Sequence, residues 1–269
     1  MIYTNFGLSK TVKMVRKIYL IPMTLLLLFS VSCGRESNVV IVGGGNVRVV
    51  ESDKKEESAA LLAVMSIVDK GREAVDEIKR PVIGEAAMPL EKYIPESPLM
   101  NFAADALLNM AQKYSDVPVD IAITNKGGLR SNLPQGVITF GDIYNVFPFE
   151  NTLAMLTLNG EQLLQLCREI ASVGGEAVSG LELLITSDGN LLKATAGGLA
   201  IEPDKKYRIA TSDYLSQGND KMAALALGTD RNVRGDITIR NLMVQYIKDL
   251  ALRGEMLNAK CDGRIKVKK

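Results

Sequence analysis

Two kinds of apolar spacing alternate along the sequence, and this alternation restricts the fold more than any other feature. Apolar residues recur every three or four positions, as in amphipathic helices, over residues 58–79, 97–114, 161–172 and 238–252. Short apolar runs typical of buried strands cover residues 119–124, 153–159, 181–186 and 207–212. Because helices and strands are mixed and some strands follow one another like hairpins, we predict a single α+β domain with mixed sheets and packed helices.

Two of the helical segments carry further signals. Ser97 and Pro98 are residues preferred at the N-cap and the first position of a helix, so we expect a helix to begin there. Its apolar face, which should pack inward, comprises Phe102, Ala103, Ala106, Leu107, Met110 and Tyr114. Cys167 lies on the apolar side of the helix over 161–172, where we expect an inert buried thiol; a reactive cysteine is the alternative.

The sequence contains no histidine. Histidine is the commonest metal ligand and the usual proton-transfer group near neutral pH. Dinuclear sites that need histidine, Ser-His-Asp triads and Cys-His dyads are therefore excluded within this chain, and we expect it to hold no catalytic residue, metal or cofactor. The 32 basic and 31 acidic residues leave a net charge of +1. That balance argues against a nucleic-acid polymer as partner, because such binding needs a strongly basic face.

The N-terminal residues have the parts of a secretory signal peptide. Arg16 and Lys17 precede an apolar run over residues 18–31, which is short for a membrane-spanning helix, although a short membrane anchor is the alternative. Cys33 follows a small residue, as at a bacterial lipobox, while Ser30 stands where leucine is commoner. We predict cleavage before Cys33 and lipid attachment to its thiol. The mature chain would then be an exported lipoprotein, anchored to a membrane in the periplasm or at the cell surface of a bacterium.

These signals divide the chain into a signal peptide over 1–33, a tether over 34–57 and a folded domain over 58–269. Met14 is a more natural initiator than the first methionine. The glycine run within residues 42–47 lacks the strand–GxGxxG–helix arrangement of a dinucleotide site, so we interpret it as a turn.

A glycine-rich loop, "NKGGLRSNLPQG", follows the predicted strand over 119–124. Glycines let the backbone approach a ligand closely, and the amide of Asn125 can both donate and accept hydrogen bonds. The planar fork of Arg130 suits phosphate or neighbouring oxygens. A purely structural turn is the alternative interpretation of this loop.

Two later loops carry aromatic candidates. Phe149, in "NVFPFENTL", could stack on a base, a contact worth about 1–3 kcal/mol, or could belong to the core. In "SDYLSQGNDKM", Tyr214 is a second ring, and Asp220 could accept hydrogen bonds from two neighbouring ribose hydroxyls, although an aspartate there is often only a turn residue. Together with Asn125 and Arg130, these side chains are those needed to hold a nucleoside.

The order of several segments resembles one family. They are "ESPLMNFAADAL", "VDIAITNKGGLRSNLPQGVITFGDIYNVFPFENTLAMLTLNGEQLLQL", "VSGLELLIT", "YRIATSDYLSQGND" and "DGRIKV". They cover roughly residues 60–267 and are similar to the C-terminal, substrate-recognition domain of the 5′-nucleotidase and UDP-sugar hydrolase family. The resemblance implies that Phe149 and Tyr214 sandwich a base, that Asn125 and Arg130 contact the ligand, and that Asp220 binds the ribose.

The sequence also departs from the family pattern. An arginine usual before the "ES" segment is absent, and Lys92 is the nearest cation; Lys126 stands where a small residue is usual. Both lysines are candidates for phosphate contact. Asn219 stands where relatives often have glycine, and Tyr214 where phenylalanine is commoner. Relatives also carry an N-terminal metallophosphatase domain with a two-metal site, for which this chain has no histidines.

Three functions follow from this resemblance. The chain could be the nucleotide-recognition module of a split 5′-nucleotidase-type hydrolase in nucleotide catabolism, inactive alone and completed by a separate metallophosphatase chain that holds the divalent metals. It could instead be a surface lipoprotein that binds a nucleoside or nucleotide without catalysis. A remnant whose site has degenerated into an interaction surface is the third reading. Unaided hydrolysis is the least supported.

Overall fold

The computed structural model of the chain describes residues 54–268. The predicted signal peptide, the lipidation site Cys33 and the glycine turn over 42–47 lie outside the described residues, as does the predicted tether except for its last four positions, 54–57. The chain divides into two compact units at Val64/Met65. This division falls inside helix α3 (Lys54–Lys79), and the domain start at residue 58 stays a prediction.

Helix α3 begins at Lys54, earlier than the periodicity indicated. Its apolar side chains are exposed, with Leu62 at 65% and Ile67 at 71% of their full accessibility. The helix is therefore not held by burial within the described residues, in contrast to those that follow. No helix among residues 54–268 combines the length and apolarity needed to cross a bilayer.

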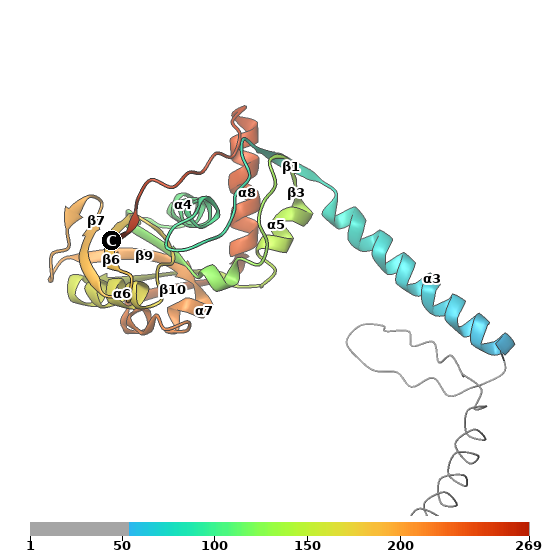
Figure 1. Ribbon diagram of the computed structural model, residues 1–269, viewed down its shortest axis with the longest axis horizontal. Coiled ribbons are helices and arrows are strands. Elements are labelled where there is room, and N and C mark those ends of the chain that lie inside the picture. Colours follow the sequence, from blue (N-terminus) through green and yellow to red (C-terminus); the bar gives the residue numbers. More distant parts are fainter. Residues whose placement is uncertain (1–53, 269) are drawn as a thin grey trace, which may run out of the picture. The chain divides into compact units, whose positions relative to one another are not determined.

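A five-stranded sheet of the second unit has the order β10-β4-β9-β2-β5. Figure 1 shows one of its strands, β9, between helices α4 (Pro98–Gln112) and α6 (Gly160–Ser172). Its strands are β2 (Ile121–Thr124), β4 (Thr152–Asn159), β5 (Ala177–Ser179), β9 (Lys206–Ser212) and β10 (Thr229–Thr238). β2 and β9 run parallel, and every other neighbouring pair is antiparallel. The chain must therefore cross over between β2 and β9, and the ends of these two strands meet at one edge of the sheet.

Both faces of this sheet are covered. Successive side chains of a strand point to opposite faces, so each strand serves two cores. Ala122 and Ala210 face α4 and α8 (Ile239–Leu252), whereas Ile121, Ile123 and Ile209 face α6. Small residues on the first face let α4 lie close to the strands, and branched residues fill the second.

Two smaller sheets complete the fold. β1 (Val82–Ala86) pairs with β3 (Gly136–Thr139), and a four-stranded sheet has the order β11-β6-β7-β8. The latter is formed by β6 (Leu181–Thr186), β7 (Leu191–Ala196), β8 (Leu199–Ala200) and β11 (Ile265–Lys268). The remaining short elements are α5 (Phe140–Val146), α7 (Asp213–Ser216) and the 3₁₀ turns η1 (Lys126–Gly128) and η2 (Ala223–Leu227). Arg264 ties the C-terminal strand to the core by donating to Asp105 on α4 at 2.7 Å and to the carbonyl of Val178 at 2.8 Å.

The α+β prediction is confirmed, and the predicted helices and strands form. Ser97 caps α4 as expected and accepts from the amide of Met100. The prediction was wrong at the other end of that helix: α4 ends at Gln112, so Tyr114 lies beyond the helix and is 37% exposed. Cys167 is buried, as predicted, and desolvation raises the pKa of its thiol to about 12; its inertness stays a prediction.

Candidate functional site

Sheet topology brings the three candidate loops to one edge. The parallel strands β2 and β9 end at Thr124 and Ser212, so the loops that follow them leave the same side. β4 runs antiparallel to β9 with Leu153 opposite Ser212, so the loop that precedes β4 starts from that side too. The amide of Thr152 donates to the carboxylate of Asp213 at 2.9 Å and joins two of these loops directly.

Asp220 connects two of the predicted ligand residues. The amide of Asn125 donates to its Oδ2 at 2.6 Å, and the hydroxyl of Tyr214 donates to its Oδ1 at 2.9 Å. Because this hydrogen bond stabilises the protonated phenol, the pKa of Tyr214 lies above its ordinary value. Asn125 is buried, whereas Tyr214 and Asp220 are exposed. A carboxylate bound in this way fixes the amide of Asn125 and the ring of Tyr214 relative to each other.

The turn that presents Asp220 is left-handed. Asp220 and Lys221 have φ values of 53° and 65°, and the preceding Gly218 has a φ of 87°. Asn219, which stands where relatives often have glycine, is not itself left-handed. Asn219 instead donates its amide to the carbonyl of Tyr214 at 2.8 Å and closes the turn.

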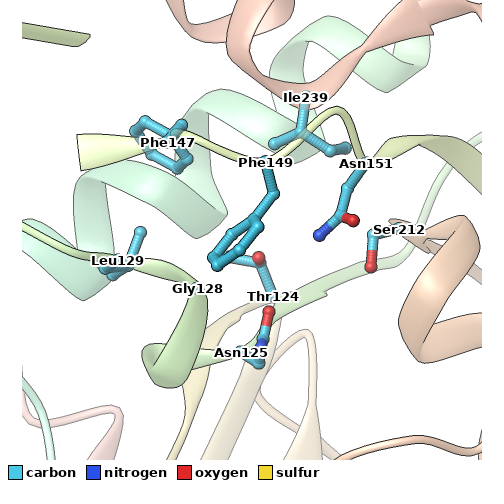
Figure 2. Close-up of a pocket in the computed structure, with 9 residues that line it drawn as sticks. All are labelled: Thr124, Asn125, Gly128, Leu129, Phe147, Phe149, Asn151, Ser212 and Ile239. Atoms are coloured by element: carbon cyan, nitrogen blue, oxygen red, sulfur yellow. The ribbon is translucent and has the colours of Figure 1, made fainter. Parts of the chain in front are cut away.

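Phe149 lines a pocket at the same edge. Figure 2 shows its ring reaching from the loop before β4 toward Thr124 and Gly128, with the amide of Asn151 beside it. The pocket is small, with a cavity volume of about 20 Å³, and is lined by Thr124, Asn125, Gly128, Leu129, Phe147, Phe149, Asn151, Ser212 and Ile239. Phe149 is 49% exposed, so it is not a core residue, which was one of its two interpretations. Its neighbour Phe147 is the core residue, 6% exposed and edge-on to Phe102.

Lys126 of the glycine-rich loop fastens that loop to Glu176 and its neighbours through hydrogen bonds. The amine of Lys126 donates to the carbonyls of Val173 and Gly175 and to the carboxylate of Glu176, at 2.9, 2.7 and 3.1 Å. Its backbone amide donates to the other oxygen of Glu176 at 2.5 Å. Burial raises the pKa of Glu176, and the contacts with Lys126 oppose that shift. Within the loop, a Cβ on Gly128 would lie 2.9 Å from Oδ1 of Asn125, so the close approach needs glycine.

The three cations near the loop differ in their availability. All three protons of the Lys126 amine already have protein acceptors, and the amine of Lys92 donates to the carbonyls of Leu129 and Lys126 at 2.6 and 3.4 Å. The guanidinium of Arg130 is exposed and makes one long contact, 3.4 Å to the carbonyl of Gly127. Arg130 is thus the cation best placed to take an external anion, and the phosphate roles of Lys92 and Lys126 stay predictions.

Sequence reasoning missed several side chains of this site. Asn151 and Ser212 line the pocket, and Glu176 anchors the glycine-rich loop. Asn151 lies two residues after Phe149, a spacing that places alternate residues of an extended segment on one side, and this signal could have found it. Glu176 has no such signal, because its role depends on Lys126, which is 50 positions away.

The groups at this edge are of the kinds that bind a ligand with a flat ring and polar atoms. The ring of Phe149 and the amides of Asn125 and Asn151 line the pocket, whereas the Asp220 carboxylate joins it through Asn125. The exposed guanidinium of Arg130 lies beside the carbonyl of Gly127 on the glycine-rich loop. Among residues 54–268, no three acidic or cysteine side chains are placed to hold a metal ion. The described residues therefore do not fit the two-metal centre of a phosphatase.

Comparisons with known proteins agree with the fold and the motifs. The family model "5′-nucleotidase, C-terminal domain" matches residues 82–227. The trifunctional nucleotide phosphoesterase protein YfkN of Bacillus subtilis is 27% identical over 251 residues, which are 86% of this chain and 17% of that protein. The 5′-nucleotidase of Vibrio cholerae is 27% identical over 67% of this chain and 33% of its own length.

A solved structure shows the same fold. The 5′-nucleotidase precursor from Thermus thermophilus superposes with a TM-score of 0.66 at 24% identity, over 77% of this chain and 43% of that one. The chain thus spans less than half the length of these relatives. With the family model covering more than half of the sequence, and with the ordered segments and the sheet topology in agreement, this chain belongs to the family of 5′-nucleotidase C-terminal domains.

Proposed function

We propose that this chain is a nucleotide-recognition module that acts with a separate metallophosphatase chain, as one half of a split 5′-nucleotidase-type hydrolase. One observation carries the proposal: Asn125, Phe149, Tyr214 and Asp220, from three loops, gather at one edge of the sheet. A base would stack on Phe149, its polar edge facing the amides of Asn125 and Asn151. As the resemblance implies, Tyr214 would cover the other face of the base, Asp220 would bind the ribose, and Arg130 would contact phosphate.

The partner in this proposal supplies what the chain lacks. A two-metal centre activates water and stabilises the leaving group in phosphoester hydrolysis, and its divalent ions would be held by the partner's residues. The relatives with nucleotidase names are longer proteins, of which this chain matches a part. Export and attachment through a lipid on Cys33 would place the chain at the periplasm or cell surface, where a secreted phosphatase could meet it.

Calorimetric titration tests the pocket. The chain from residue 34 onwards is titrated with adenosine and with AMP, beside two variants. Phe149→Ala should weaken binding about 5- to 150-fold, which corresponds to the loss of one base-stacking contact. Tyr114→Ala, which removes another exposed ring outside the pocket, should bind like the parent chain. Equal binding by parent and Phe149→Ala would refute the proposed pocket.

A second titration assigns the phosphate contact. If Arg130 takes the phosphate, AMP should bind more tightly than adenosine, and Arg130→Gln should abolish that difference while leaving adenosine binding unchanged. If the difference persists in Arg130→Gln, then Lys92 or Lys126 holds the phosphate instead.

The alternative function is nucleoside binding without catalysis by a surface lipoprotein. It predicts the same titrations but no partner. Affinity capture of the lipidated chain from its native envelope, followed by assay of the eluate for AMP hydrolysis that a chelator blocks, separates the two. Chelator-sensitive hydrolysis in the eluate supports the split enzyme, and its absence supports binding alone.

A further inference from the structure

Arg240 lies in an unfavourable place for an arginine, for two reasons. It occupies the first turn of α8, at the positive end of the helix dipole, where an acidic side chain is favoured. Its guanidinium is nearly buried, with 8% of the side chain exposed, and its Nε finds no partner among the described residues. A buried cation with an unpaired nitrogen at the N-terminal end of a helix is destabilising. We therefore expect the contacts of its two remaining nitrogens to offset this cost or to serve binding.

Those contacts all lie on the loop that carries Phe149. Nη1 donates to the carbonyls of Phe147 and Pro148, at 3.2 and 3.3 Å, and Nη2 donates to the carboxylate of Glu150. The guanidinium also lies over the ring of Tyr144, 4.6 Å from its centroid. One side chain thus binds the residues on both sides of Phe149.

The loop has little structure of its own to replace this clamp. Residues 147–151 belong to no helix or strand, and Pro148 has no amide hydrogen to donate. The loop ends are fixed elsewhere, by the amide of Phe147 on the carbonyl of Ile143 and by the amide of Ile239 on the carbonyl of Asn151. Between these two anchors, the contacts with Arg240 determine the path of the backbone, and with it the direction of the Phe149 ring in the pocket (Figure 2).

We infer that Arg240 is a positioning residue for ligand binding: it holds the loop over 147–150 so that Phe149 presents its face to the pocket. The inference rests on the proposed function for its consequence, namely base affinity. Its structural premise, an ordered loop, is independent of any ligand. Lysine cannot replace this arginine, because a single ammonium group cannot bind two carbonyls and a carboxylate in a fixed fork.

The test combines exchange, titration and a double-mutant cycle. In Arg240→Lys without ligand, amide hydrogen exchange should accelerate at Phe147, the loop residue whose amide donates to the carbonyl of Ile143, and stay unchanged in β4. Adenosine affinity should fall about 5- to 50-fold, a part of one stacking contact. Arg234→Lys is the matched control, because Arg234 also pairs with a carboxylate, on Asp236, and lies over a tyrosine, Tyr114, but has no contact with the loop.

The cycle separates positioning from general destabilisation. In a Phe149→Leu background, where little stacking is left to lose, Arg240→Lys should have a much smaller effect on adenosine affinity than in the parent chain. Additive losses, or unchanged exchange in the loop, would overturn the inference even if the parent chain binds adenosine. If the parent chain binds no nucleoside, the proposed function fails, and the exchange experiment alone decides whether Arg240 orders the loop.

Discussion

Lys126 and Glu176 are joined twice: the side-chain amine of Lys126 donates to one carboxylate oxygen at 3.1 Å, and its backbone amide donates to the other at 2.5 Å. The pair ties the glycine-rich loop to the segment after α6. Lys126 therefore stabilises the conformation of the loop, and through it the position of Asn125, one residue earlier.

Lys126→Met should destabilise the domain by about 1.5–3 kcal/mol, because it removes the charged donor of the buried Glu176 carboxylate, which then keeps, within residues 54–268, only the backbone amide of residue 126. Urea unfolding measures the change. Lys113→Met is the control, because it removes an exposed ion pair with Asp249 and should cost at most about 1 kcal/mol. Equal losses of stability in the two variants would show that the Glu176 carboxylate needs no charged partner.

The Glu176 carboxyl gives a pH dependence of defined sign. Burial raises its pKa in the folded state above the ordinary value of 4.5, so the unfolded chain releases this proton at lower pH. Between those two values the folded state binds more protons, and the contribution of this group to stability falls as the pH rises. The free energy of unfolding of the parent minus that of Glu176→Gln should therefore decrease from pH 4 to pH 7. A difference that increases over this range would reverse the assignment.

Tyr214→Phe should strengthen the binding of adenosine. The hydroxyl of Tyr214 occupies Oδ1 of Asp220, which a ribose hydroxyl could otherwise use, so its removal frees one acceptor. We expect about 2- to 10-fold tighter binding, the worth of one hydrogen bond. The 2′,3′-dideoxy analogue of adenosine, which lacks the two neighbouring ribose hydroxyls, should show no such gain. A gain of the same size with both ligands would mean that Asp220 does not contact the ribose.

Gly175→Ala should be strongly destabilising. Gly175 has a φ of 110°, and a Cβ there would lie 2.3 Å from the carbonyl oxygen of Pro95. We expect a loss of about 2–4 kcal/mol from strain and displaced backbone. Gly197→Ala is the matched control: its φ is also positive, at 58°, but nothing lies within 4 Å of an added Cβ. Comparison of the two melting temperatures isolates the steric part.

Cys167 should resist alkylation in the native state. Its pKa of about 12 leaves almost no thiolate at pH 8, and the side chain is buried, whereas Cys261 is exposed. In a chain with Cys33→Ser, a thiol reagent should modify one cysteine in buffer and two in denaturant. Mass spectrometry identifies which one, and rapid native modification of Cys167 would contradict its burial.

The sequence predicted elements that carry their own apolar pattern and missed those that do not. Residues 161–172 and 207–212 show clear periods, and α6 and β9 lie there. The strand β10, "TDRNVRGDIT", is polar and mostly exposed, and it exists because its backbone pairs with β4. A strand imposed by a neighbour leaves little trace in its own residues.

The sequence predicted which side chains belong to the site but not the hydrogen bonds between them. The loops carrying Asn125, Phe149, Tyr214 and Asp220 could be singled out by residue type and by resemblance. Their hydrogen bonds could not, because Asn125 and Asp220 are 95 positions apart and meet only through the parallel pairing of β2 with β9. The contact of Lys126 with Glu176 has a different cause, the antiparallel pairing of β2 with β5, which sets Thr124 opposite Ala177.

Parallel pairing of β2 and β9 has a thermodynamic consequence. The pocket is lined by residues next to the ends of β2, β4 and β9, so no single loop or hairpin contains the site, and global unfolding abolishes it. A ligand that binds only the folded state raises the stability of the whole domain, by about 2.7 kcal/mol at a concentration one hundred times its dissociation constant. Melting of the domain can therefore serve to screen nucleosides, sugars and phosphates for the natural ligand, without an enzymatic assay or a partner chain.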